Sequence, residues 1–237
     1  MFDISVITGN WAYFARGIGM TILITTAGML LGFGIGFLVA LLRTATLLPL
    51  RIAVGIYVEV LRNIPFIILL FIFFYGLPFA GIRIPSQVAG TVALALFCSA
   101  YYAEILRGAM AAVPSGQIEA ARAMGLTHLQ ILRDIIVPQM WKFALPPMAG
   151  TTTTTVKESS VLSTIAVSEL TYQGLIVQGM TFAPFEVFAT VAGLYWIFTA
   201  VLTWGFHRAE RAVGSPEMTE VIRSKVARKY LSLDHRM

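Results

Sequence analysis

The stretch PSGQIEAARAMGLTHLQILRDIIVP, residues 114–138, carries charged side chains between very apolar segments. It is therefore predicted to be a water-exposed loop of a membrane protein rather than another membrane span. Ser115 suits the N-cap of a first short helix, which would place Glu119 near the positive end of that helix. Gly125 suits the position just after the helix, where a positive φ is common. The first half of the loop thus predicts a short helix that ends in a glycine turn.

The second half of the same loop predicts another helix. Thr127 and Gln130 have the spacing of a capping box, in which each side chain bonds to the other residue's backbone N–H. Pro138 is expected to stop this helix, because proline lacks the N–H that a helix interior needs. The loop is thus predicted to be a helix, a tight turn and a helix, held to the membrane at both ends.

The composition places the chain in the membrane. Hydrophobic residues make up 57% of its 237 residues and charged residues only 12%, whereas soluble domains average about 25% charged residues. The single cysteine, Cys98, excludes an internal disulfide framework. The first residues lack the basic start and cleavage site of a signal peptide, so they are expected to remain in the mature protein. The fold class is an all-α integral membrane protein.

Five apolar stretches are long enough to cross a bilayer. They are bounded by an interfacial N-terminal segment, which is rich in aromatic residues, and by a charged tail. The predicted spans are residues 17–42, 52–79, 86–108, 139–157 and 187–207; the N-terminal segment covers 1–16, the loop 114–137 and the tail 209–237.

The distribution of basic residues predicts the orientation. If the first helix enters from outside, the inner segments hold 13 of the 17 lysines and arginines. The outer segments hold only Arg16 and Arg83, and Arg62 and Lys157 lie in or near the spans. This bias predicts an N-terminus outside and a C-terminus inside, with the 114–137 loop in the cytoplasm.

The second span carries two charges followed by a proline. Glu59 and Arg62 are three residues apart on one helical face, so they can pair, and Pro65 should bend or break the helix. Charges at this depth usually face a bundle interior or an aqueous cavity. Alternatively, the two residues lie near the cytoplasmic interface and anchor the helix. The sequence supports both interpretations equally.

The loop resembles the EAA loop of the membrane subunits of ATP-binding-cassette (ABC) importers. The resemblance rests on Glu119-Ala120-Ala121, on Gly125 and on Ile-Val-Pro at 136–138. In that family the loop forms a coupling helix that sits in a groove of a separate ATPase. The resemblance implies that the ATPase is contacted by four residues of the loop, Glu119, Ala120, Ala121 and Gly125. The alternative is a surface amphipathic helix without a partner.

Other motifs resemble the polar amino-acid branch of this family, the permeases of the histidine, glutamate and glutamine type. They cover the chain from about residue 17 to 208 and imply a type I permease domain with five spans. The matching motifs are Gly17-x-Gly-x-Thr21, Arg62-Asn-Ile-Pro65, the 101–125 block, Pro146-Pro147 and 157–160. The chain departs from the pattern at Asn63-Ile64, where Gly-Thr is common, so the fine structure beside Arg62 is left open.

Polar residues around the fourth span are candidates for the substrate passage. Five threonines, 151–155, suit a broken helix or the border of a polar passage better than a lipid-facing helix. The Lys157-Glu158-Ser159-Ser160 sequence matches the pattern of amino-acid permeases; alternatively, Lys157 and Glu158 form an interfacial ion pair. The predicted passage residues are Arg62, Thr154, Lys157, Glu158 and Ser160.

Several kinds of chemistry are missing from the sequence. No lysine follows a glycine, so the chain has no phosphate-binding loop and is not the ATPase. Its three histidines lack metal-ligand spacing, and no hydrolase motif appears, so we expect no enzyme activity, metal or cofactor in this chain. ATP would be bound by the partner subunit. The basic tail is better explained by topology and anionic lipid than by nucleic acid.

The resemblance also implies a set of partners at the bacterial inner membrane. They are ABC ATPase subunits, a second permease subunit that is identical or paralogous, a periplasmic or lipid-anchored solute-binding protein, membrane lipids and an amino acid. Two other classes are weighed against this one: an ion-coupled secondary transporter and a membrane scaffold protein. The substrate itself is left open, because arginine and lysine hold the carboxylate of any amino acid.

Overall fold

The computed structural model describes residues 2–44 and 47–214, and every regular element in these ranges is a helix. The predicted tail lies mostly outside the described residues. In chain order the helices are α1 (Ile4–Gly9), α2 (Trp11–Leu42), α3 (Leu48–Asn63), α4 (Phe66–Gly76), α5 (Ser86–Ala111), α6 (Ser115–Ala123), α7 (His128–Gln130), α8 (Val137–Glu158), α9 (Leu170–Thr181) and α10 (Pro184–Val213), with 3-10 segments at Leu77–Ala80 and Ser159–Ile165 and a π-helical segment at Ile131–Ile136.

Three helices are long and apolar enough to span a membrane alone, namely α2, α5 and α10. Two further spans are bent pairs. The first consists of α3 and the segment Phe66–Ala80, bent by 108°, and the second of His128–Ile165 and α9, bent by 51°. The described chain is therefore an all-helical membrane protein with up to five spans.

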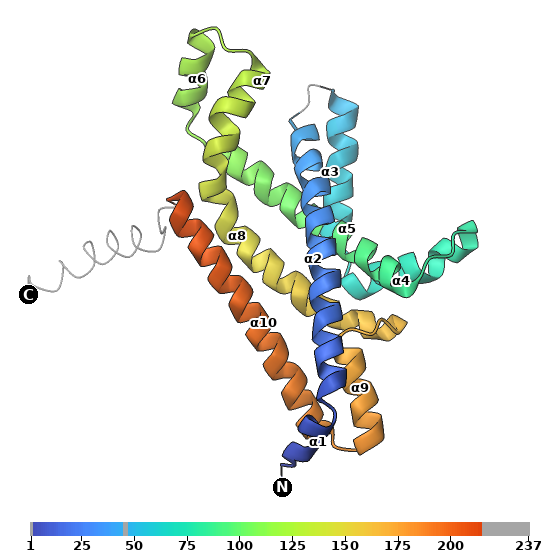
Figure 1. The fold of residues 1–237 in the computed structure, drawn as a ribbon. Coiled ribbons are helices and arrows are strands. Elements are labelled where there is room, and N and C mark those ends of the chain that lie inside the picture. Colours follow the sequence, from blue (N-terminus) through green and yellow to red (C-terminus); the bar gives the residue numbers. More distant parts are fainter. Residues whose placement is uncertain (1, 45–46, 215–237) are drawn as a thin grey trace, which may run out of the picture.

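Helix α5 lies at the centre of the bundle and α10 at its edge. In the most apolar window of α5, 61% of the residues are buried, against 11% for α10. Buried side chains of α2, α4 and α8 pack around α5 in one hydrophobic core. Figure 1 shows α5 crossing α2 at the middle of the molecule.

Small residues allow α2 and α5 to approach closely. Gly28, Gly32 and Gly36 are buried on the face of α2 that meets α5. A β-carbon built at Gly32 would lie 2.2 Å from Cys98 Sγ and 2.7 Å from the carbonyl oxygen of Ala95. Because these distances are far below van der Waals contact, the two backbones can meet only if this position is glycine.

The break at Pro65 occurs where the sequence predicts it. Helix α3 ends at Asn63, and α4 begins at Phe66, directly after the proline. The side-chain amide of Asn63 donates a hydrogen bond to the backbone carbonyl oxygen of Glu59 over 2.7 Å. This bond satisfies one of the carbonyl groups left free in the last turn of the helix. The expectation of a bent second span is therefore confirmed.

Two details of the 114–138 loop differ from the prediction, and the first is the N-cap. Pro114 occupies this position with φ −58° and ψ 128°, and Ser115 is the first helical residue, without a side-chain cap. The fixed φ of proline already suits an extended residue before a helix. Glu119 consequently lies in the middle of α6 rather than in its first turn.

The second difference is that the helix does not stop at Pro138. The capping box of Thr127 and Gln130 is confirmed, and Gly125 has a positive φ of 81°. The chain then passes through the π-helical segment, where Val137 donates to the carbonyl oxygen of Leu132, and continues as α8. The wider π turn makes room for the proline ring, which would clash with a carbonyl in a regular α-helix.

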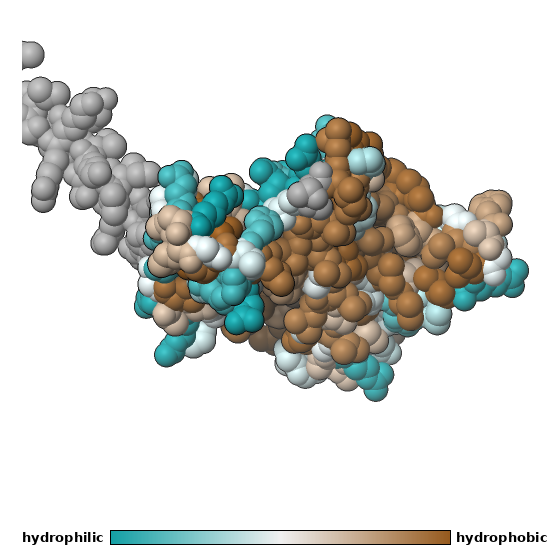
Figure 2. Space-filling view, turned by 90° about the horizontal axis from the view of Figure 1, so that it is seen from above, coloured by the Kyte–Doolittle hydropathy of each residue, from teal (hydrophilic) through white to brown (hydrophobic). Residues whose placement is uncertain are grey.

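The loop with α6 and α7 projects from one end of the molecule. Figure 1 shows it at the end where α2 finishes, with α1 and α9 at the opposite end. Seen from that end in Figure 2, hydrophilic residues gather on the projecting loop, while hydrophobic residues dominate the helical body beside it. The arrangement matches a membrane-embedded body with one polar protrusion.

Candidate functional site

The first candidate site is the exposed surface of α6. Glu119 and Ala120 are exposed, whereas Ala121 is buried with 1% of its surface accessible. The amide of Gln139 on α8 donates to the side-chain oxygen of Gln117, which ties α6 to the body of the protein. The helix therefore presents a carboxylate beside a small alanine, which leaves room for a partner to approach closely.

The glycine turn after α6 completes this surface. The Gly125 N–H donates to the carbonyl oxygen of Arg122 over 2.9 Å, and Leu126 N–H donates to that of Ala121 over 3.1 Å. These bonds are typical of a helix that ends in a left-handed residue. The four residues predicted for coupling, 119–121 and 125, thus lie together on one short helix and its turn.

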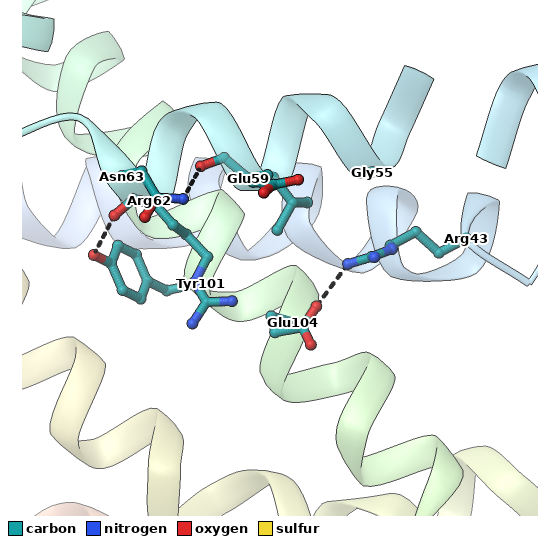
Figure 3. A pocket seen from close by; sticks show the side chains of 8 residues that line it. Arg43, Gly55, Glu59, Arg62, Asn63, Tyr101 and Glu104 are labelled. Carbon is teal, nitrogen blue, oxygen red and sulfur yellow. Dashed lines mark hydrogen bonds and ion pairs between the residues drawn. The ribbon is translucent and has the colours of Figure 1, made fainter. Parts of the chain in front are cut away.

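The second candidate site is a pocket of about 470 Å³ between α2, α3 and α5. We call it the α3–α5 pocket, and Figure 3 shows its side chains. It lies at the end of α3, just before the Pro65 break. The lining residues are Arg43, Gly55, Val58, Glu59, Arg62, Asn63, Tyr101 and Glu104.

One carboxylate of this pocket is fully occupied by arginines. Glu104 Oε2 lies 2.6 Å from Arg43 Nη1, and its other oxygen pairs with Arg107 one turn along α5. The Arg43 pair links the end of α2 to α5. Each pairing with arginine stabilises the ionised form of the carboxylate.

Arg62 is held differently. Its guanidinium carbon lies 5.4 Å from the ring centroid of Tyr101, and the Tyr101 hydroxyl donates to the Arg62 carbonyl oxygen over 3.4 Å. The spacing of Glu59 and Arg62 allows an ion pair, but none joins them in the described part of the chain. In Figure 3 the Arg62 guanidinium instead points between Tyr101 and Glu104.

Lys157 lies in a different pocket, between α8 and α10. This pocket of about 650 Å³ has threonines on both helices and two tryptophans on α10. Its lining residues are Thr153, Lys157, Ala192, Tyr195, Trp196, Thr199, Ala200, Thr203, Trp204 and His207. The structure therefore does not bring Arg62 and Lys157 into one pocket of this chain.

The remaining predicted passage residues surround the end of α8. Thr154 is exposed, Glu158 is the last residue of α8, and the Ser160 hydroxyl donates to the Lys157 carbonyl oxygen over 2.7 Å. Helix α8 runs unbroken through the five threonines, and the hydroxyls of Thr153 and Thr155 bond to carbonyls one turn earlier. The threonines thus follow a continuous helix, and the break comes only after Glu158.

Glu169, which no motif in the sequence singles out, is completely buried. Its carboxylate accepts the backbone N–H groups of Thr171 (2.9 Å) and Tyr172 (2.7 Å) and the hydroxyl of Tyr195 (2.7 Å). It therefore caps α9 and joins it to α10. In the sequence it is one acidic residue in a stretch of mixed polarity, residues 161–186.

Most of the chain is similar in sequence to known transport proteins. Residues 32–215 match the family described as "Binding-protein-dependent transport system inner membrane component". A probable glutamine ABC transporter permease protein of Bacillus subtilis is 36% identical over 209 residues, which cover 88% of this chain and 97% of that protein. The octopine transport system permease protein of Rhizobium meliloti is 31% identical, over 82% of this chain and 87% of that protein.

A solved structure is also similar. The crystal structure of an amino acid ABC transporter with histidines contains a chain that is 33% identical and superimposes with a TM-score of 0.84. The match covers 90% of this chain and 99% of that one. The similarity thus extends over nearly the whole length of both chains.

Proposed function

The chain belongs to the family of binding-protein-dependent transport system inner membrane components, and we propose that it is the permease subunit through which a polar or charged amino acid, or an amino-acid derivative, enters a bacterial cell. The observation that carries this proposal is the similarity, along nearly the whole chain, to an amino acid ABC transporter. Relatives named as glutamine and octopine permeases support a polar substrate class.

The energy for transport comes from a separate ATPase. The exposed α6 with Glu119 and Ala120 supports a role as the coupling helix, because it projects from the apolar body where a soluble partner can reach it. Ala121 and Gly125 shape the helix and its exit. ATP binds to the partner, and closure of the ATPase subunits moves α6 and, through α8, the membrane helices.

The substrate passage is formed with a second permease subunit, identical or paralogous. Exposed polar side chains on membrane helices support this, because they need an aqueous or protein environment. The residues proposed for the passage are Arg62, Thr154, Lys157, Glu158 and Ser160. A solute-binding protein delivers the amino acid from outside, and the chain lies in the cytoplasmic membrane with its N-terminus outside.

Vesicle uptake tests the coupling proposal. Vesicles holding this chain, its ATPase and its partner permease are given the solute-binding protein and a panel of labelled amino acids, with and without ATP, for the wild type and for Glu119→Lys. We expect ATP-dependent uptake of at least one amino acid and its loss in Glu119→Lys, because the reversed charge opposes a basic partner residue.

The matched control is Glu186→Lys, which makes the same charge change at the start of α10, beside α1 and far from α6. It should retain uptake, and both variants should still assemble with their partners. Uptake that persists without the ATPase and follows a proton or sodium gradient would contradict the proposal and favour an ion-coupled transporter.

A further inference from the structure

The lining of the α3–α5 pocket carries equal numbers of basic and acidic side chains. Its lining residues include two arginines, 43 and 62, and two glutamates, 59 and 104. Arg43 and Glu104 pair with each other at 2.6 Å. Within the described residues, no carboxylate is within ion-pair distance of Arg62, and Glu59 takes part in no ion pair. The pocket thus offers one cation and one anion that are still available to a ligand.

The two available charges come from one face of the same helix. Residues three apart on a helix have β-carbons about 5–6 Å from each other, so Glu59 and Arg62 lie one turn apart on α3. Tyr101 supports the Arg62 guanidinium from one side, and in Figure 3 Arg62 extends from α3 toward Tyr101 and Glu104. Glu59 is the other charged residue that α3 contributes to the lining. A pocket of about 470 Å³ is within the range of small-molecule sites.

Electrostatics selects the kind of molecule. A simple anion would pair with Arg62 and leave Glu59 without a partner, and a simple cation would do the reverse. Both side chains are exposed in this chain, so a ligand that covers them displaces the water around each charge, and a covered charge without a partner is costly. A ligand that carries an anionic group and an ammonium group a few atoms apart pairs with both residues and adds no net charge to the pocket.

We propose that the α3–α5 pocket binds a zwitterion, with the anionic group on Arg62 and the ammonium group on Glu59. Two sources supply this chemistry: a free amino acid, in which case the inference rests on the proposed function, and the headgroup of phosphatidylethanolamine. The lining residues named above all belong to this chain, and the pocket is separate from the pocket of Lys157.

Ligand analogues test which charge meets which residue. The complete transporter is placed in nanodiscs of phosphatidylglycerol alone, and the binding of L-glutamine, L-arginine, L-glutamate and L-cystine is measured. The amino acid that binds most tightly is compared with its decarboxylated amine and its N-acetyl derivative. This pairing of variant and analogue forms a double-mutant cycle.

Each variant should affect only ligands that carry the matching group. Arg62→Gln should weaken binding of the amino acid at least about tenfold and leave binding of the decarboxylated amine unchanged. Glu59→Gln should weaken binding of the amino acid but not of the N-acetyl derivative. Arg51→Gln, an exposed arginine on α3 that does not line the pocket, is the control and should bind like the wild type.

The lipid source is tested in mixed nanodiscs by native mass spectrometry. Phosphatidylethanolamine retained by the wild type but lost from both pocket variants assigns the pocket to the lipid. If neither the amino acid nor the lipid responds to either substitution, or if a variant weakens parent and analogue equally, the zwitterion site is overturned. ATP-driven uptake measured in parallel separates this outcome from failure of the proposed function, which would instead abolish wild-type uptake of every amino acid.

Discussion

At the scale of single residues, Glu169 shows how a buried polar side chain can stabilise a membrane bundle. Its side chain is completely buried and accepts three hydrogen bonds, two from the α9 backbone and one from Tyr195. The neighbouring Leu170 N–H donates to the Thr21 hydroxyl of α2 over 3.1 Å. The start of α9 is therefore attached to both α2 and α10 through polar contacts.

Removing this carboxylate should destabilise the bundle. Glu169→Ala leaves two backbone N–H groups of α9 without their cap, which should cost about 1–3 kcal/mol. We expect a lower midpoint of thermal unfolding in detergent. Tyr195→Phe removes only one donor and should have a smaller effect. Unfolding of Glu169→Ala at the wild-type temperature would show that α9 is held by its apolar contacts alone.

The residues that sequence reasoning identified correctly have local causes. The positive φ of Gly125 and the capping box of Thr127 depend on neighbours within four residues, so the sequence contains the required information. Glu169 depends on Tyr195, which lies 26 residues away on another helix. Its role could not be predicted because no local pattern records which helices will meet.

At the scale of helices, the contact between α2 and α5 determines the centre of the fold. Gly32→Ala should destabilise the protein by about 1–3 kcal/mol, because the added methyl would meet Cys98 and the backbone of Ala95. Gly34 is on the same helix but has open space at its β-carbon. Gly34→Ala should therefore leave stability unchanged or raise it slightly.

Thermal unfolding of the two purified variants tests this prediction, since both make the same chemical change two residues apart. A clear loss of stability in Gly32→Ala only would confirm that close backbone contact holds α2 to α5. Equal midpoints for the two variants would mean that the helices can shift to accept a methyl group at little cost.

The prolines show how far helix boundaries can be predicted. The break at Pro65 was predicted correctly because a proline excludes a regular helical bond at its own position. The same rule failed at Pro138, where the π-helical segment widens the backbone and lets the helix continue. The rule correctly identifies the missing N–H. Whether the helix then ends or continues through a wider π-helical turn depends on the packing around the proline.

At the scale of the whole molecule, the sequence predicts the spans better than it predicts their neighbours. Hydropathy alone gave five stretches, and the structure has up to five spans when bent pairs are counted. The passage residues were predicted as one set, yet Arg62 and Lys157 line separate pockets of this chain. Hydropathy indicates what enters the membrane, whereas helix pairing depends on contacts between distant residues.

The orientation of the whole molecule is the last prediction, and a matched pair of cysteine variants tests it. Gly9 on α1 and Gly116 on α6 are both exposed, with open space at the β-carbon, and the native Cys98 is completely buried. In intact cells, a membrane-impermeant maleimide should label Gly9→Cys and leave the unmodified protein unlabelled. Gly116→Cys should react only after the membrane is opened, because the excess of basic residues predicts that α6 lies in the cytoplasm.

The opposite labelling pattern would have a consequence beyond topology. If Gly116→Cys reacted in intact cells, α6 would face outward, where no ATP is available. A cytoplasmic ATPase could then neither contact α6 nor move it, whatever the shape of that helix. The direction in which the chain enters the membrane therefore decides whether the exposed carboxylate of Glu119 can serve energy coupling at all.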